Sequence, residues 1–140
     1  MELNHFQELL NCIKLLEQKT IQFPDVGKQR KYRLYCISEK NEKFELIINR
    51  KGHLNRQNLT YQMMSHSLKG VLVRLDCNGA PHDDIETPHI HIFDEEHDYG
   101  RIAIGLGDLE VDLANELLDS LIYFLDYTNV NYDNVAIPFL

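Results

Sequence analysis

Residues 68–77 read Leu-Lys-Gly-Val-Leu-Val-Arg-Leu-Asp-Cys, and this stretch decides the fold class. Apolar side chains recur at every second position, which is the period of a β-strand. The alternation predicts a buried face formed by Val71, Val73 and Leu75. Cys77 shares their parity, whereas Arg74 and Asp76 belong to the opposite face. The fold therefore contains a strand with one core face and one polar face.

Further strands are predicted on both sides of this one. Short stretches of alternating apolar residues are separated by polar links, among them a hairpin turn at residues 39–42. Because most of these links are short, consecutive strands are expected to pair in antiparallel. The predicted strands cover residues 31–38, 44–49, 59–66, 88–93 and 101–106.

Two amphipathic helices are predicted, one near each end of the chain. After a cap at Asn4, apolar residues follow at spacings of three and four as far as Leu16. A second apolar stripe runs through residues 109–127, behind a cap at Asp108. The sequence therefore predicts an α+β fold, with an antiparallel sheet of about five to six strands and both the N-terminal and the C-terminal helix packed on one face.

The totals indicate one small acidic domain. A chain of 140 residues, 44% apolar and 26% charged, has the size of a single globular domain, which we place at residues 1–140. No stretch approaches the roughly 18–20 apolar residues that span a bilayer, and the N-terminus lacks the pattern of a signal peptide. Three cysteines at wide spacings form no disulfide framework. We therefore expect a cytoplasmic protein without membrane contact.

Histidines cluster shortly after the strand that decides the fold. His89 and His91 stand two apart in a predicted strand, so their imidazoles project from one face, while Ile90 and Ile92 point to the core. Two imidazoles on a rigid strand form a common metal-binding pair, and neutral imidazole suits zinc, copper, iron and nickel. His82, in the preceding turn, is placed to fold back as a third ligand. We predict a zinc site at these three histidines.

Strand parity decides between the candidates for a fourth ligand. Asp76 lies on the polar face, where a metal beside the histidine pair would sit, whereas Cys77 shares the buried parity. A bulge at residues 78–79 would reverse this preference, and thiolate is a good zinc ligand. His97, in a charged turn, and a water molecule are further alternatives. We favour Asp76.

The same segment resembles the motif of a family of small bacterial and prophage proteins of unassigned function. That motif has an Arg-Leu-Asp strand, a Gly-x-Pro-His turn and a Pro-His-aliphatic-His strand, and the likeness extends through residues 70–130. Cys77 departs from the aliphatic residue expected at its position. The resemblance implies that the shared site residues are Asp76, His82, His89 and His91.

Charge divides the chain into two unlike halves. Residues 1–75 carry 13 Lys and Arg against 7 Asp and Glu, a net charge of +6. Residues 76–140 carry 15 acidic residues and a single basic one, Arg101, a net charge of −14. An acidic surface attracts basic protein surfaces and repels nucleic acid. The partner favoured by this pattern is a protein with a basic surface.

Small acidic proteins with a metal motif also resemble, more loosely, the phage anti-CRISPR proteins that inhibit type II CRISPR effector nucleases. That resemblance implies a phage- or prophage-encoded inhibitor in the host cytoplasm, with zinc in a structural role. Its partner would be the nuclease, and it would make no direct contact with nucleic acid. Such a protein acts by binding, so we lean against an enzyme without excluding one.

A metal-dependent enzyme is the alternative. Zinc with three protein ligands and an open position activates water, and Asp83, Asp84 or Glu86 would then serve as general base. A ribonuclease toxin of a toxin–antitoxin pair fits this description. The acidic surroundings count against it because they repel a nucleic-acid substrate. We favour the inhibitor.

Overall fold

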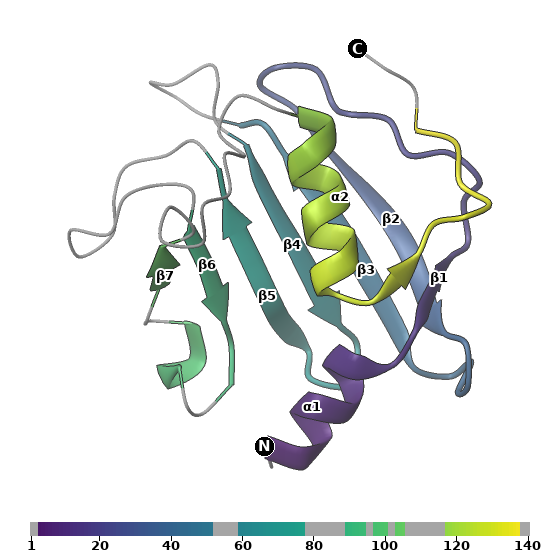
Figure 1. The fold of residues 1–140 in the computed structure, drawn as a ribbon, viewed down its shortest axis with the longest axis vertical. Coiled ribbons are helices and arrows are strands. Elements are labelled where there is room, and N and C mark those ends of the chain that lie inside the picture. The colour runs from purple at the N-terminus through teal and green to yellow at the C-terminus, as the bar shows by residue number, and fades with distance from the viewer. Residues whose placement is uncertain are drawn as a thin grey trace.

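The structure is a computed structural model that describes residues 3–51, 59–77, 89–94, 97–100, 103–105 and 117–137. Within these residues, eight strands form a single sheet in the order β7-β6-β5-β4-β3-β2-β1-β8 (Figure 1). The strands are β1 (Lys14–Leu16), β2 (Gln29–Cys36), β3 (Lys43–Asn49), β4 (Thr60–Ser65), β5 (Gly70–Asp76), β6 (His89–Ile92), β7 (Ala103–Gly105) and β8 (Val130–Asn131). The helices are α1 (Leu3–Asn11), α2 (Leu117–Tyr127) and the short 3-10 helix η1 (Asp98–Gly100).

The sheet is a meander from β1 to β7, in which each strand pairs antiparallel with the next. The chain then returns through α2 to the opposite edge, where β8 pairs parallel with β1. The prediction of about five to six antiparallel strands was therefore wrong in number and in the parallel pair. The two strands of that pair have three and two residues, which is too short for alternation to appear in the sequence.

The two helices occupy different places on the sheet. Figure 1 shows α2 lying across one face, where the ring of Phe124 stacks on Tyr61 of β4 with 5.5 Å between the ring centroids. By contrast, α1 lies at the end of the strands, where His5 approaches Glu42. The prediction that both helices pack on one face is thus corrected for α1. None of the described helices is long and apolar enough to cross a bilayer.

The first helix is shorter than its apolar stripe predicts. It begins at Leu3, so Asn4 is not its cap, and it ends at Asn11, after which residues 14–16 form β1. Ile13, which the stripe assigns to the core, is 50% exposed. The helix ends early because β1 pairs with β2 and Lys14 is buried. Such tertiary contacts outweigh the weak helix propensities of these residues.

The sheet has the core face and the polar face that the sequence predicts. Val73, Leu75 and Cys77 are fully buried on the core side, and Ile90 and Ile92 of β6 are buried as predicted. Val71 is only half-buried, contrary to expectation. A register shift between Met63 and Met64 of β4 falls opposite this part of β5 and breaks the alternation there.

Candidate functional site

Pairing of β5 with β6 brings two of the predicted site residues together. Arg74 lies opposite His91 in the register, and Asp76 lies opposite His89. The side chain of His91 reaches diagonally across the pair, so its Nε2 lies 3.2 Å from Oδ2 of Asp76. His91 is 3% exposed, which makes this a buried contact between an imidazole and a carboxylate. The meander thus joins residues that are 15 positions apart in the sequence.

A backbone carbonyl fixes the orientation of the His91 ring. Nδ1 of His91 lies 2.7 Å from the carbonyl oxygen of Gly100. Because a carbonyl oxygen only accepts hydrogen bonds, Nδ1 must carry the proton and donate it. The other nitrogen, Nε2, faces the Asp76 carboxylate, which is also an acceptor. Two acceptors face each other there, so a proton on Nε2 or a cation beside it is compatible with this contact.

The turn that presents this carbonyl is held by Asp94 and by an unusual glycine. Oδ1 of Asp94 accepts hydrogen bonds from the backbone N–H of His97 at 2.9 Å and from its Nδ1 at 2.6 Å. The Asp94 carbonyl accepts one from the N–H of Tyr99 at 2.8 Å. Gly100 has φ +91°, and a Cβ built there would lie 2.5 Å from Cε2 of Phe93. Only glycine fits this position, so the carbonyl that orients His91 depends on it.

Asp76 is held on its other sides by two neighbours on the polar face. Nε of Arg74 donates a hydrogen bond to Oδ2 of Asp76 at 3.3 Å and lies 3.2 Å from Oδ1. The hydroxyl of Thr60 on β4 donates to the same oxygen at 3.3 Å. These contacts favour the ionised carboxylate. Oδ2 of Asp76 therefore lies between Arg74 and His91, while Oδ1 faces Thr60.

The remaining predicted ligands are placed as follows. His89 lies in β6 opposite Asp76 and Gly105, and only its backbone is described. His82 lies outside the described residues. Cys77 is fully buried on the core face, as its parity predicts, and His97 contacts Asp94 instead of the His91 pair. Within the described part of the chain, no group of three or more His, Cys, Asp and Glu side chains is close enough to hold a metal ion.

The pair formed by His91 and Asp76 fits two positions of a zinc site. Ligands about 2.0–2.1 Å from a tetrahedral zinc ion stand roughly 3.3 Å apart, close to the observed separation. A ligating histidine usually donates its second ring N–H to a carbonyl or carboxylate, which is the arrangement of His91 and Gly100. The pair alone does not complete a coordination shell, so further ligands would have to come from His82 and His89.

Sequence reasoning missed the supports of the site. Gly100 acts through its backbone carbonyl, and a carbonyl has no residue-type signature. The available signal was a glycine at the end of the acidic turn, where a left-handed conformation is common. Thr60 was missed because its contact with Asp76 depends on the register between β4 and β5.

Comparison with known proteins identifies a family. The sequence profile described as "Family of unknown function (DUF6978)" matches residues 1–130, a span that includes α1, the strands from β1 to β7 and both members of the His91–Asp76 pair. No curated protein matches the chain, and no solved structure matches it. The expected membership in a family without an assigned function is thereby confirmed, over a longer span than residues 70–130. The chain belongs to the family of unknown function DUF6978.

Proposed function

We propose that this protein binds one zinc ion through His91 and Asp76, with His82 and His89 as the other ligands. The observation that carries the proposal is the 3.2 Å approach of Nε2 of His91 to the Asp76 carboxylate, while Nδ1 is already committed to Gly100. In a neutral imidazole with the proton on Nδ1, the lone pair is on Nε2. That lone pair is directed toward Oδ2 of Asp76. We place the zinc ion between them, bound by Nε2 of His91 and by the carboxylate of Asp76.

The positions of the other two histidines support the same site. Residues two apart in a strand share a face, so strand parity in the sequence predicts His89 on the face of His91, and its backbone pairs with that of Asp76. His82 lies in the segment that connects β5 to β6, and this connection starts and ends beside the pair. Three imidazoles and one carboxylate form a closed four-coordinate shell, which is typical of a structural zinc ion.

The role that this zinc serves, in our proposal, is to present an acidic surface to a basic protein. The connection between β5 and β6 carries Asp83, Asp84 and Glu86, and the second half of the chain has a net charge of −14. Such a surface fits the basic cleft of a nucleic-acid-handling protein, and competes there with nucleic acid. A type II CRISPR effector nuclease is the partner that we propose, with this protein as a phage-encoded inhibitor.

Calorimetric titration with zinc tests the ligand set. We expect wild-type protein, stripped of metal, to bind one zinc ion, and His91→Ala and Asp76→Asn each to weaken that binding about tenfold or more. His66→Ala is the matched control, because His66 lies in the turn between β4 and β5, outside the site. Equal zinc affinity in all four proteins would show that the pair is an imidazolium–carboxylate ion pair.

A cleavage assay tests the partner. We expect the wild-type protein to inhibit DNA cleavage by a type II CRISPR effector nuclease, more strongly at low salt because the contact is between opposite charges. Replacing Asp83, Asp84 and Glu86 by Lys should abolish inhibition, whereas the same change at the exposed residues Glu17, Asp25 and Glu39 should preserve it. Wild-type protein that inhibits no such nuclease but cleaves RNA in a zinc-dependent manner would favour the ribonuclease toxin.

A further inference from the structure

Two of the three cysteines come together at the other end of the sheet, far along the meander from the His91–Asp76 pair. Cys12 follows α1 directly, and its backbone N–H still donates to the carbonyl of Glu8 at 3.0 Å. Cys36 is the last residue of β2 and lies opposite Lys14 in the register with β1. The N–H of Ile37 donates to the carbonyl of Ile13 at 2.8 Å, which continues the ladder toward Cys12. The two cysteines thus lie diagonally across paired chain segments, where the Cys12 thiol donates to the carbonyl of Leu9 at 3.6 Å and Sγ of Cys36 lies 3.4 Å from the hydroxyl of Ser38.

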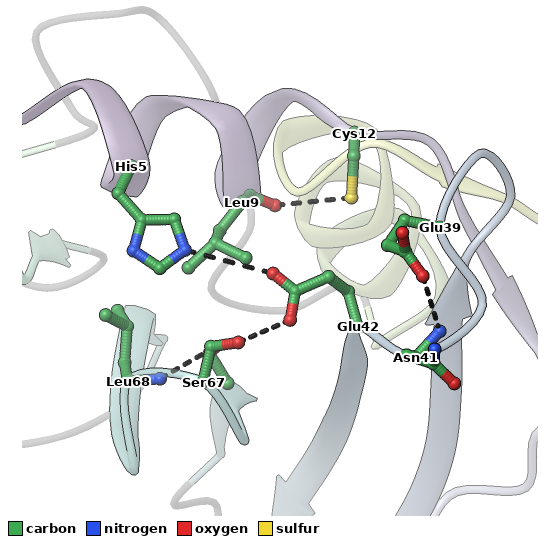
Figure 2. A network of polar contacts seen from close by, with 9 residues as sticks. His5, Leu9, Cys12, Glu39, Asn41, Glu42, Ser67 and Leu68 are labelled. Carbon is green, nitrogen blue, oxygen red and sulfur yellow. Dashed lines mark hydrogen bonds and ion pairs between the residues drawn. The ribbon is translucent and has the colours of Figure 1, made fainter.

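Both thiols line a cavity between α1 and the turn that connects β2 to β3. Its volume is about 460 Å³, and its walls include His5, Glu42 and Ser38. Figure 2 shows Cys12, His5 and Glu42 on neighbouring parts of this wall. Nε2 of His5 lies 3.9 Å from Glu42, whose carboxylate also accepts a hydrogen bond from Ser67. A small polar molecule can therefore reach the thiol pair from this side.

The surroundings make the two thiols chemically unequal. Burial raises the pKa of Cys12 to about 12, and the neighbouring Cys36 acts in the same direction. Burial also disfavours the Cys36 thiolate, but polar contacts with Cys12 and with Ser38, whose Oγ lies 3.4 Å from Sγ of Cys36, lower the Cys36 pKa on balance. Cys36 is therefore the sulfur that ionises, and Cys12 is the neutral thiol beside it.

We propose that Cys12 and Cys36 form a redox-active dithiol that hydroperoxides oxidise to a disulfide. The Cys36 thiolate attacks one peroxide oxygen of hydrogen peroxide, the O–O bond breaks, and Cys36 sulfenic acid and hydroxide result. The sulfur of Cys12 then attacks the sulfenic acid, a sulfur–sulfur bond forms, and water leaves with the Cys12 proton. In total, two thiols and one hydrogen peroxide give one disulfide and two waters.

The third cysteine supplies an internal control for this chemistry. Cys77 is fully buried at the end of β5, and burial raises its pKa to about 12. It has no thiol partner among the described residues, since the other two cysteines lie on β2 and next to α1. The proposal therefore predicts that Cys77 stays reduced under conditions that oxidise the pair.

Peptide mapping of the full-length wild-type protein tests the proposal without any substitution. The three cysteines fall in different tryptic peptides, covering residues 1–14, 34–40 and 75–101. After brief treatment with hydrogen peroxide and blocking of free thiols, we expect the first two peptides to be linked by a disulfide that dithiothreitol reverses. Peptide 75–101 should be recovered with a blocked thiol. Equal recovery of all three as blocked thiols, or links between different chains, would overturn the proposal.

Two single substitutions test the order of the steps. In Cys12→Ser, the sulfenic acid on Cys36 has no thiol to react with, so dimedone should trap it. In Cys36→Ser, Cys12 should remain a thiol, and its dimedone labelling should be at least about tenfold lower. Circular dichroism establishes that both variants are folded. Equal labelling of Cys12 and Cys36 in the two variants would contradict the assignment of Cys36 as the attacking sulfur, and the wild-type map tests the disulfide independently.

Discussion

At the scale of single residues, the candidate site depends on how His91 is held. Its Nδ1 is fixed by the Gly100 carbonyl, and its Nε2 meets Asp76, which Arg74 and Thr60 orient in turn. Each contact is ordinary in strength, but together they leave the ring a single orientation. A histidine that is buried and oriented in this way is suited to hold a metal ion without rearrangement.

Gly100 should be intolerant of any side chain. In Gly100→Ala, the methyl group meets the Phe93 ring at 2.5 Å, and the backbone keeps a φ of +91° that alanine disfavours. We expect a loss of about 2–4 kcal/mol in the free energy of unfolding, measured by urea denaturation. Gly27→Ala is the matched control, with φ +87° and nothing within 4 Å of the added Cβ, so it should cost only about 1 kcal/mol. Equal losses would mean that the Phe93 ring moves aside freely.

The sequence predicts the two side chains that meet at this site better than it predicts their supports. Asp76 and His91 were identified because strand alternation places polar side chains on one face, and that rule needs only local parity. The contact of His91 with Gly100 depends on a turn closed by Asp94, and no residue-type pattern encodes which carbonyl such a turn presents. The sequence therefore does not predict the parts of the site that backbone atoms form.

At the scale of the elements, Lys14 joins the ends of both helices. Its side chain is fully buried, and Nζ donates to the carbonyls of Leu10 at 3.0 Å, Cys12 at 3.1 Å and Thr128 at 2.8 Å. Asn129 adds a hydrogen bond from its side chain to the Leu10 carbonyl at 2.9 Å. Carbonyls at helix ends are unsatisfied within the helix and carry partial negative charge, which a cation stabilises.

Replacing Lys14 by an apolar residue of similar length should remove the hydrogen bonds that join the two helix ends. In Lys14→Met, buried carbonyls lose their donor, and we expect the free energy of unfolding to fall by about 3 kcal/mol. Lys43→Met is the control, because Nζ of Lys43 lies 5.4 Å from the centroid of the Tyr35 ring, a contact worth about 0.5–1 kcal/mol. Urea denaturation of both variants measures the difference. Similar losses would show that the carbonyls of the helix ends find other donors.

The buried position of Lys14 also has a consequence for pH dependence. Burial lowers the pKa of Lys14 from its ordinary value of 10.5 to about 8. Between these two values the unfolded chain binds more protons at this residue than the folded chain, so the Lys14 contribution to stability rises with pH across this window. An NMR titration of the Lys14 ammonium group should show a midpoint near 8. A midpoint near 10.5 would contradict the assignment.

The region around Lys14 shows where prediction of the elements from the sequence succeeds and where it fails. The strands from β2 to β6 follow from alternation, because their apolar positions repeat over four or more residues. The end of α1 did not follow, because Ile13 and Leu16 continue a helical spacing although residues 14–16 form β1. A lysine at position 14 gives no local sign of burial, since lysine is rarely buried without partners and one of its partners, the Thr128 carbonyl, is distant in the sequence.

At the scale of the whole molecule, the proposed zinc ion would join β5, β6 and the connection between them. The ligands are shared between β5, β6 and the connection between them, so the ion closes a loop at the end of a two-stranded pair. A metal that binds only the folded state stabilises it by mass action, by about 2.7 kcal/mol at a hundredfold excess over the dissociation constant. The stability of the entire domain should therefore depend on zinc.

Removal of the metal should lower the melting temperature. We expect a chelator to shift the unfolding midpoint of zinc-loaded wild-type protein downward by about 5–10 °C, in a scan followed by circular dichroism. Asp76→Asn should melt at the same temperature with and without chelator, because it binds zinc poorly. An unchanged wild-type midpoint would point to a metal that serves an open, reactive site.

The central claim is that this protein holds zinc at His91 and Asp76, and its zinc content tests the claim most directly. The measurement is elemental analysis of tag-free wild-type protein, purified without chelators, beside the His82→Ala, His89→Ala, His91→Ala triple variant. We predict about one zinc ion per chain in the wild type and almost none in the variant. Wild-type protein without zinc, or a variant that retains it, would contradict the account.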